Sequence, residues 1–447
     1  MPNRFPLMIA AVLALLLLAG PAAASDYVPG EVIVGYKDGT TARVQSAVER
    51  QAGTGTEEDL PGGSSQLAIH DGESVRETVA ELRSDPNVAY AAPNYVARAS
   101  QFEPNDPYFS RQWNLYGPFG IGMPEAWALA EAAGAPGGRG AVVAVLDSGV
   151  AFERFGGFRR APDLKRSTFV HGWDFVDRDR HPNDRYGHGT HVTGTIAQAT
   201  NNGIGVAGVA YGVKIMPLRV LNDYGEGDSV AIAKAIRYAA RRGADVINLS
   251  LEFDRRVVAD EIPEILAAVR YAHSRGAVIV AAAGNTGKKY LRRVAYPARA
   301  SEVIAVGATT RRGCRSEYSS FGADLDVVAP GGGVDAEPAT QEELLLCHPE
   351  RAGSWIYQET FLSGNTVRRF GLPNSYEGTS MASPHVAGIA ALIIATGKLG
   401  PNPTPNAVQA HIQATARDLG RPGPDSRYGA GLVDAARALR CPPLTPC

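Results

Sequence analysis

Short apolar runs and amphipathic stretches alternate along most of the chain after about residue 101. The apolar runs are continuous, which is typical of strands buried on both faces of a parallel sheet. We expect strands at 141–146, 213–218, 245–251, 277–283 and 303–306, and helices at 188–200, 229–242, 261–275, 407–415 and 433–439. The alternation predicts an α/β fold in which helices flank a mostly parallel central sheet.

Residues 26–100 follow a different pattern and are expected to fold as a small unit of their own. Strands are expected at 32–36, 66–69 and 88–91, with helices at 42–52 and 73–84 between them. The resulting β-α-β-α-β order predicts a compact α+β unit of ferredoxin-like type.

The first 25 residues have the pattern of a secretory signal peptide. Arg4 supplies the positive end, residues 7–18 form the apolar core, and the alanines at 22–24 offer a cleavage site. A transmembrane anchor is the alternative, but the run is shorter than the roughly 20 residues that span a bilayer. We therefore expect a secreted protein, extracellular or periplasmic, with no membrane contact after the signal is cleaved.

Two loop-like regions interrupt the pattern of strands and helices. The segment 331–376 is long and mixed in character, so we expect a surface insertion. The other region is the Pro-rich tail, residues 441–447. A long ordered loop such as 331–376 is more often functional than not.

Export makes disulfides possible, and the chain has four cysteines. Three pairings are formally allowed. We favour the pair 314–347, because both cysteines lie in loop-like sequence, and the pair 441–447, which closes a tight Pro-rich loop. No pair has the CxxC spacing of a redox or zinc site.

Composition narrows the function classes. Hydrophobic residues make up 45% of the chain and charged residues 20%, which is typical of a globular protein. The net charge of −2 argues against a nucleic-acid-binding protein that works by bulk charge. We expect no nucleic-acid partner.

Two motifs place ionisable side chains at the ends of expected elements. Asp147, in the sequence DSG, follows the strand at 141–146, at the sheet edge where α/β proteins collect catalytic groups. On its own, a turn or capping aspartate is the simpler interpretation. His188 opens a helix with the sequence HGTH, and its spacing to His191 is compatible with zinc. The glutamate of an HExxH motif is missing, however, and no third ligand stands at a telling spacing.

Ser380 opens an apolar helix that runs to about residue 396, within the sequence GTSMASPH. Its small neighbours let a substrate carbonyl approach, and the amino end of a helix stabilises negative charge that develops there. An ordinary N-cap serine is the alternative. Pro384, in the first turns, removes a helix hydrogen bond, which favours a kink or break.

Together these residues suggest nucleophilic catalysis. A serine hydroxyl needs a base to remove its proton, and an aspartate fixes the tautomer of that base and stabilises the imidazolium. The chain supplies one of each in the order Asp, His, Ser, which is one of the orders in which this geometry recurs. A serine esterase of α/β-hydrolase type is the alternative, but that fold needs the order Ser, Asp, His.

With these three motifs, the chain resembles the subtilase family of subtilisin-like serine proteases over about residues 101–440. The sequence PNDPYF at 104–109 is similar to the thermitase-like branch. The resemblance implies a subtilisin-like fold and an endopeptidase that acts on protein or peptide substrates through an acyl-enzyme. It implies that Ser380 is the nucleophile, His188 the general base and then acid, and Asp147 the residue that orients His188. Asn285, at the end of the sequence AAAGN, matches the family's oxyanion-hole donor.

The resemblance also implies how substrate binds. The sequence NLSL at 248–251 matches the family's edge strand that pairs with an extended peptide. Glu252 and Phe253 depart from the family's Gly-Gly. We hypothesise that Glu252, near the rim of the first specificity pocket, favours a basic residue before the scissile bond or narrows the pocket, unless Arg292 or Arg293 neutralises it. The implied substrate-binding residues are Asn248, Leu249, Ser250, Leu251, Glu252 and Gly284.

Calcium is the cofactor that the resemblance implies. The loop TNNGIGV at 200–206 matches the family's main calcium loop, and calcium prefers oxygen ligands. A plain surface turn is the alternative. The implied ligands are the side chains of Asp106, Asp163 and Asn202 and the carbonyls of Thr200, Ile204 and Val206.

The unit at 26–100 looks like the propeptide of such proteases, which folds the enzyme and blocks its cleft. The resemblance thus implies an intramolecular inhibitor that is removed by autoprocessing near residues 94–101. We expect the mature enzyme to be a monomer. An inactive binding protein that keeps the scaffold is a further alternative, and the four intact site residues argue against it.

Overall fold

The computed structural model of the 447-residue chain describes residues 27–95, 102–287, 293–362 and 366–445. It divides into two compact units, an N-terminal unit within residues 1–100 and a C-terminal unit within residues 101–447. The expected signal peptide lies outside the described residues. Among the residues that are described, no helix is long and apolar enough to cross a bilayer.

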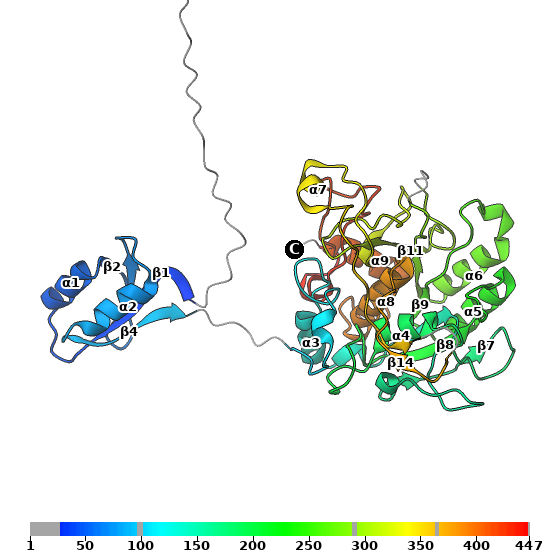
Figure 1. Ribbon diagram of the computed structural model, residues 1–447, viewed down its shortest axis with the longest axis horizontal. Coiled ribbons are helices and arrows are strands. Elements are labelled where there is room, and N and C mark those ends of the chain that lie inside the picture. Colours follow the sequence, from blue (N-terminus) through cyan, green and yellow to red (C-terminus); the bar gives the residue numbers. More distant parts are fainter. Residues whose placement is uncertain (1–26, 96–101, 288–292, 363–365, 446–447) are drawn as a thin grey trace, which may run out of the picture. The chain divides into compact units, whose positions relative to one another are not determined.

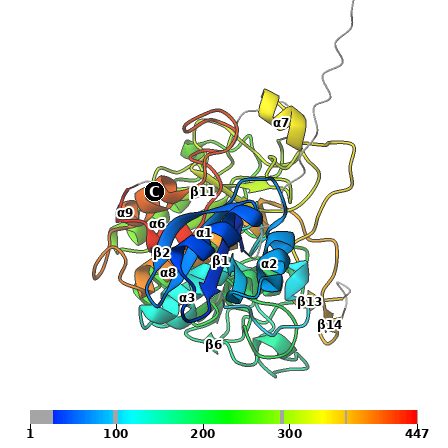
Figure 2. The ribbon, with the colours of Figure 1, turned by 90° about the vertical axis from the view of Figure 1, so that its left-hand side faces the viewer.

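The N-terminal unit has the order β-α-β-β-α-β. Its elements are β1 (Tyr27–Tyr36), α1 (Ala42–Gln51), β2 (Thr54–Leu60), β3 (Ser64–Ile69), α2 (Val75–Ser84) and β4 (Val88–Tyr95). The strands form an antiparallel sheet in the order β2-β3-β1-β4. Both helices pack on one face of it through a core that includes Val32, Leu67 and Val79 (Figure 2). The ferredoxin-like expectation is confirmed.

Strand β2 is missing from the order that the sequence predicts. Its sequence TGTEEDL is rich in acids, and most of it is exposed at the edge of the sheet. Charged, exposed edge strands discourage pairing with other chains, and they present no apolar face that periodicity can reveal. Gly62 and Gly63, both at positive φ, form the turn that leads into β3.

The C-terminal unit is built on one large sheet. Its strands are β5 (Val142–Asp147), β6 (Thr168–Phe169), β7 (Trp173–Asp174), β8 (Lys214–Arg219), β9 (Val246–Leu249), β10 (Val278–Ala282), β11 (Val303–Thr309) and β12 (Val327–Pro330). All pairs are parallel, in the order β12-β11-β10-β9-β5-β8-β6, and β7 also pairs with β8.

Helices cover both faces of this sheet (Figure 1). One face carries α5 (Ser229–Arg241) and α6 (Pro263–Ser274). The other carries α3 (Met123–Ala132), α4 (His188–Ala197), α8 (Thr379–Ala395), α9 (Pro405–Thr415) and α10 (Ala435–Arg440). Along β5, Val143 and Val145 enter one core while Ala144 and Leu146 enter the other, which explains the continuous apolar run. The predicted α/β fold is confirmed.

Helix α3 and strand β12 were not expected from the sequence. The residues of α3 are apolar on most sides, and Met123, Ala126 and Trp127 are buried, so the helix lacks a clear polar stripe. Strand β9 ends at Leu249 and helix α4 at Ala197, both earlier than predicted. After Leu249 the chain forms a loop beyond the carboxyl end of β9, and after Ala197 it forms a separate loop that includes residues 200–206.

The segment 331–376 is only partly the surface insertion that the sequence predicts. It contains α7 (Gln341–Leu346) and the small hairpin of β13 (Thr360–Phe361) and β14 (Phe370–Gly371). Its residues 356 and 358–361 are buried, and the carbonyl of Ile356 lies 2.9 Å from Nε2 of His191 in α4. This part of the segment therefore belongs to the core rather than to the surface.

The disulfide between Cys314 and Cys347 is present, as predicted. It joins the loop after β11 to the residue that follows α7. The second expected pair includes Cys447, which lies outside the described residues.

Candidate active site

Asp147 is the last residue of β5 and is fully buried at the carboxyl end of the sheet. Its carboxylate receives the backbone N–H of Ser148 at 2.7 Å. Both of its oxygens lie near Nδ1 of His188, Oδ1 at 2.8 Å and Oδ2 at 3.0 Å. An imidazole Nδ1–H that donates to this carboxylate leaves Nε2 unprotonated and able to accept a proton.

His188 is the first residue of α4, and its side chain is 19% exposed. Gly187 precedes it at φ 101°, a conformation that favours glycine. Burial disfavours the charged imidazole, but the carboxylates of Asp147 and Asp184 outweigh that effect and raise the pKa of His188. The pair is therefore arranged to stabilise an imidazolium.

Asp184 is a functional residue that sequence reasoning missed. It is fully buried and accepts hydrogen bonds from the backbone N–H groups of Tyr186, Gly187 and Thr190. It also accepts the hydroxyls of Ser148 and Thr190. These bonds tie the start of α4 to the end of β5 and so fix His188 beside Asp147. Its place four residues before His188 was the only signal in the sequence.

Ser380 lies in the first turn of α8, which begins at Thr379. Its hydroxyl donates to the carbonyl of Ser250 at 3.2 Å, and the Ser250 hydroxyl donates to the carbonyl of Ser380 at 2.9 Å. Pro384 has no N–H with which to satisfy the Ser380 carbonyl four residues earlier. The Ser250 hydroxyl fills that role, and α8 continues through Pro384 to Ala395.

Asn285 follows β10 and faces the same pocket. Its Oδ1 accepts the backbone N–H of Thr379 at 2.9 Å and the Thr379 hydroxyl at 3.1 Å. Since the oxygen is engaged there, the amide Nδ2 is directed to the other side, 3.4 Å from Oε1 of Glu252. Thr379, which the sequence analysis did not single out, thus sets the orientation of the candidate oxyanion-hole donor.

A pocket of about 610 Å³ brings His188, Ser380 and Asn285 together. Ser250, Leu251 and Glu252 also line it. The backbone N–H of Asn285 donates to both Glu252 oxygens, each at 3.1 Å. Gly284 lies behind this contact, and a Cβ on it would stand 2.3 Å from Oε2 of Glu252. Desolvation of the Glu252 carboxylate raises its pKa, although the hydrogen bonds from Asn285 act in the opposite direction.

The prediction that residues 248–251 form an edge strand is wrong for Asn248 and Leu249. Residues 246–249 form β9, which pairs with β10 on one side and with β5 on the other. Asn248 is buried and bonds to the hydroxyls of Ser250 and Ser383, so it holds α8 against the sheet. A substrate strand cannot pair with Asn248 or Leu249. The residues from Ser250 onward lie beyond the paired part of β9.

The predicted calcium ligands also lie together. Asp106 and Asp163 are buried, and their carboxylates accept uncharged N–H donors from Asn201, Asn202 and Val206. Burial raises the pKa of Asp106, and it raises that of Asp163 to about 6. Within the described residues, no hydrogen bond reaches the loop's candidate carbonyl ligands, those of Thr200, Ile204 and Val206.

Glu359 is a third acid, beside Asp163, and no motif in the sequence marked it. It comes from the buried part of the segment 331–376, and its Oε2 accepts the backbone N–H of Asp163 at 2.8 Å. Burial raises the pKa of Glu359 to about 7. Two carboxylates, an amide oxygen and free carbonyls form a donor set that suits a hard cation such as calcium.

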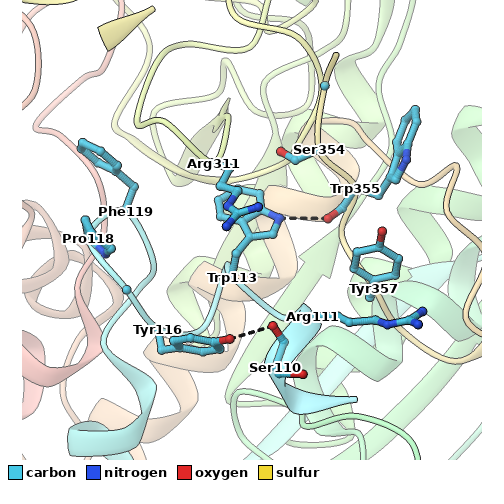
Figure 3. Close-up of a pocket in the computed structure, with 12 residues that line it drawn as sticks. Ser110, Arg111, Trp113, Tyr116, Pro118, Phe119, Arg311, Ser354, Trp355 and Tyr357 are labelled. Atoms are coloured by element: carbon cyan, nitrogen blue, oxygen red, sulfur yellow. Dashed lines mark hydrogen bonds between the residues drawn. The ribbon is translucent and has the colours of Figure 1, made fainter. Parts of the chain in front are cut away.

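A second cavity, of about 520 Å³, shares no lining residue with the pocket at Ser380. Figure 3 shows its aromatic walls, in which the indole N–H of Trp113 donates to the carbonyl of Trp355 at 3.0 Å. Arg111 and Arg311 are the charged residues that line it within the described part of the chain. The residues that line it in the described part of the chain include no aspartate, glutamate or histidine.

Comparisons with known proteins agree with this geometry. A sequence profile described as the subtilase family matches residues 138–431, and one described as the fervidolysin N-terminal prodomain matches residues 18–94. Thermitase from Thermoactinomyces vulgaris is 38% identical, over 76% of this chain and 100% of the relative. A thermophilic serine proteinase from Bacillus sp. (strain AK1) is 35% identical, over 90% of this chain and 86% of the relative.

Two further matches extend the comparison. A protein named extracellular protease, from Xanthomonas campestris pv. campestris, is 32% identical, over 96% of this chain and 77% of the relative. A solved structure of a protease from Pseudoalteromonas arctica aligns with a TM-score of 0.61 at 33% identity. The alignment covers 75% of this chain and 98% of that one.

Proposed function

Since the chain belongs to the subtilase family of serine proteases, we propose that it is a secreted endopeptidase that cuts extended polypeptides with Asp147, His188 and Ser380. One observation carries the proposal. Both oxygens of Asp147 hold Nδ1 of His188, at the wall of a pocket that Ser380 also lines.

The proposed reaction begins at Ser380. The hydroxyl turns from the Ser250 carbonyl to His188, whose Nε2 takes its proton as Oγ forms a bond to the substrate carbonyl carbon. The imidazolium is stabilised by Asp147. Collapse of the tetrahedral intermediate breaks the peptide C–N bond, and His188 gives the proton to the leaving amine. Water then repeats the sequence on the acyl-enzyme and frees Ser380.

The negative oxygen of the intermediate needs donors that are already in place. Nδ2 of Asn285 is directed into the pocket because Thr379 engages Oδ1. The backbone N–H of Ser380 lies in the first turn of α8, where N–H groups have no partner within the helix. We assign these two groups to the oxyanion hole. Substrate main chain would pair with the chain from Ser250 to Glu252, beyond the last residue of β9.

The N-terminal unit is a prodomain by its family match. We propose that it inhibits the enzyme within the precursor and is released by autoprocessing in residues 94–101. The signal pattern in residues 1–25 and the extracellular protease among the relatives support export. We also propose a structural calcium ion held by Asp106, Asp163 and Asn202 with carbonyls of the loop 200–206, which lock that loop to the body of the unit.

Substitution of Ser380 tests the proposal. The Ser380→Ala protein is expected to accumulate as unprocessed precursor, and wild type to label with a fluorophosphonate and to degrade casein. An inactive binding protein would do neither. A serine esterase would label and hydrolyse simple esters but leave casein intact. Either result contradicts the proposal, as does normal processing of Ser380→Ala in the absence of other proteases.

A further inference from the structure

The pocket at Ser380 has a one-sided charge. The carboxylates that line it belong to Glu226, Glu252 and Asp254. Among the described residues that line it, none is a lysine or an arginine. Asp254 is paired outside the pocket, with Nε of Arg256 at 2.9 Å. The wall that Glu252 forms with Asn285 therefore presents negative charge to whatever enters beside Ser380.

Glu252 occupies a sensitive position in that wall. Its residue surface is exposed, so a substrate side chain can reach it, yet its carboxylate rests against Gly284 and Asn285. It takes up the backbone N–H of Asn285 and lies 3.4 Å from Nδ2, the group assigned to the oxyanion hole. A glycine at position 252 could do neither.

This position has a catalytic consequence. A negative charge beside the oxyanion hole opposes the negative charge that develops on the substrate oxygen. It also competes for Nδ2 of Asn285. A cationic substrate side chain that binds Glu252 removes both effects, because it neutralises the carboxylate and draws it from the amide. A neutral side chain leaves both in place.

We propose that Glu252 is the specificity-determining residue of this protease, and that it selects an arginine or lysine directly before the scissile bond. The selection acts on kcat as well as on KM, because the bound cation also frees Nδ2 of Asn285 for the oxyanion hole. The inference rests on the proposed function and names its substrate class. Among the described residues, no lysine or arginine forms an ion pair with Glu252, and desolvation raises the pKa of its carboxyl group.

Matched peptides that differ only in the residue before the scissile bond test this inference. Arginine and citrulline have nearly the same shape, but only arginine is charged. We expect wild type to prefer arginine by about 10- to 100-fold in kcat/KM, with part of the difference in kcat. In Glu252→Gln and Glu252→Gly the ratio should fall to within about 3-fold, and kcat for the citrulline peptide should rise. Asp260→Asn, an exposed acid outside the pocket, is the matched control and should keep the wild-type ratio.

Other outcomes overturn the inference. An arginine-to-citrulline ratio near one in wild type, or one that Glu252→Gln leaves unchanged, removes Glu252 from specificity. A preference for alanine that disappears in Glu252→Gly means that the side chain merely narrows the pocket. Fluorophosphonate labelling and casein hydrolysis distinguish a failure of this inference from a failure of the proposed function. If both persist, only the inference falls; if both fail, the proposed function falls with it.

The chain itself supplies a second substrate. The sequence 96–101, between the two units, contains one basic residue, Arg98. Mature wild-type enzyme is expected to cut the Ser380→Ala precursor after Arg98, so that amino-terminal sequencing of the product starts at Ala99. Arg98→Gln in the precursor should slow this cut, whereas Arg98→Lys should not. A cut elsewhere in 94–101 that is indifferent to both changes counts against the selection of a basic residue.

Discussion

Asp147 and Asp163 are equally buried carboxylates of the C-terminal unit, but they face different partners. Asp147 faces the Nδ1 of His188, a base that gains and loses a proton. Asp163 faces the N–H groups of Asn202 and Val206, which cannot carry a charge. In our proposal, the same residue type at similar burial thus serves proton transfer in one region and cation binding in the other. The partner decides which.

The largest expected difference between the two regions comes from replacing Asp147 and Asp163, one at a time, with asparagine. Asp147→Asn should lower kcat by about 10⁴-fold, because an asparagine favours the wrong tautomer of His188. Asp163→Asn should leave kcat within a few-fold of wild type when calcium is present. Steady-state kinetics with one peptide substrate measures both, on protein that an added protease has matured and that has been purified away from it. Equal losses in the two variants would mean that both acids act through stability alone.

Asn285 extends the comparison to the group that stabilises negative charge. Asn285→Ala should lower kcat by about 100- to 1000-fold with little change in KM, since it removes a donor that acts mainly in the transition state. Thr379→Ala should cost no more than about 10-fold, because the backbone N–H of residue 379 still holds Oδ1. Steady-state kinetics with one peptide decides. A larger effect from Thr379→Ala than from Asn285→Ala contradicts this assignment of roles.

Much of the candidate active site could be predicted from the sequence, because each of its motifs is local. Asp147 closes an apolar strand, while His188 and Ser380 each open a helix, so topology alone brings all three to one edge of the sheet. The continuous apolar runs likewise marked strands between two helix layers.

Contacts between distant segments were not accessible in the same way. Glu359 meets Asp163 across 196 residues, and nothing in the local pattern around either residue marks that contact. The Ser250 hydroxyl that replaces the N–H of Pro384 is a similar case. Sheet order was hidden too, so the sequence could not show that β9 is a central strand and that Asn248 is structural.

Removal of calcium tests the role that we propose for Asp163. A chelator should lower Tm, because an ion that binds the folded state at 100 to 1000 times its Kd stabilises it by about 3 to 4 kcal/mol. Asp163→Asn should start with a lower Tm and respond little to the chelator. Glu103→Gln, an exposed acid near the same loop, is the matched control and should respond like wild type. Thermal unfolding with and without added calcium measures this, and identical chelator responses in all three proteins contradict the site.

The loss of activity at low pH is the smallest effect that we expect. Of Asp147 and Asp163, only Asp147 should influence the pH at which it occurs. His188 accepts the Ser380 proton only when neutral, so activity is lost as pH falls through its pKa. Burial lowers that pKa, but the carboxylates of Asp147 and Asp184 raise it by more than burial lowers it. The midpoint of the activity loss should therefore lie above the ordinary histidine pKa of about 6.5. Fluorophosphonate labelling is the suitable probe, since the reagent offers no cation to Glu252. Asp163→Asn with calcium present should share the wild-type midpoint, because Asp163 does not act on His188. A wild-type midpoint at or below 6.5 would mean that burial outweighs the carboxylates of Asp147 and Asp184. A shifted midpoint in Asp163→Asn would mean that Asp163 also acts on His188, which contradicts the separation of the two regions.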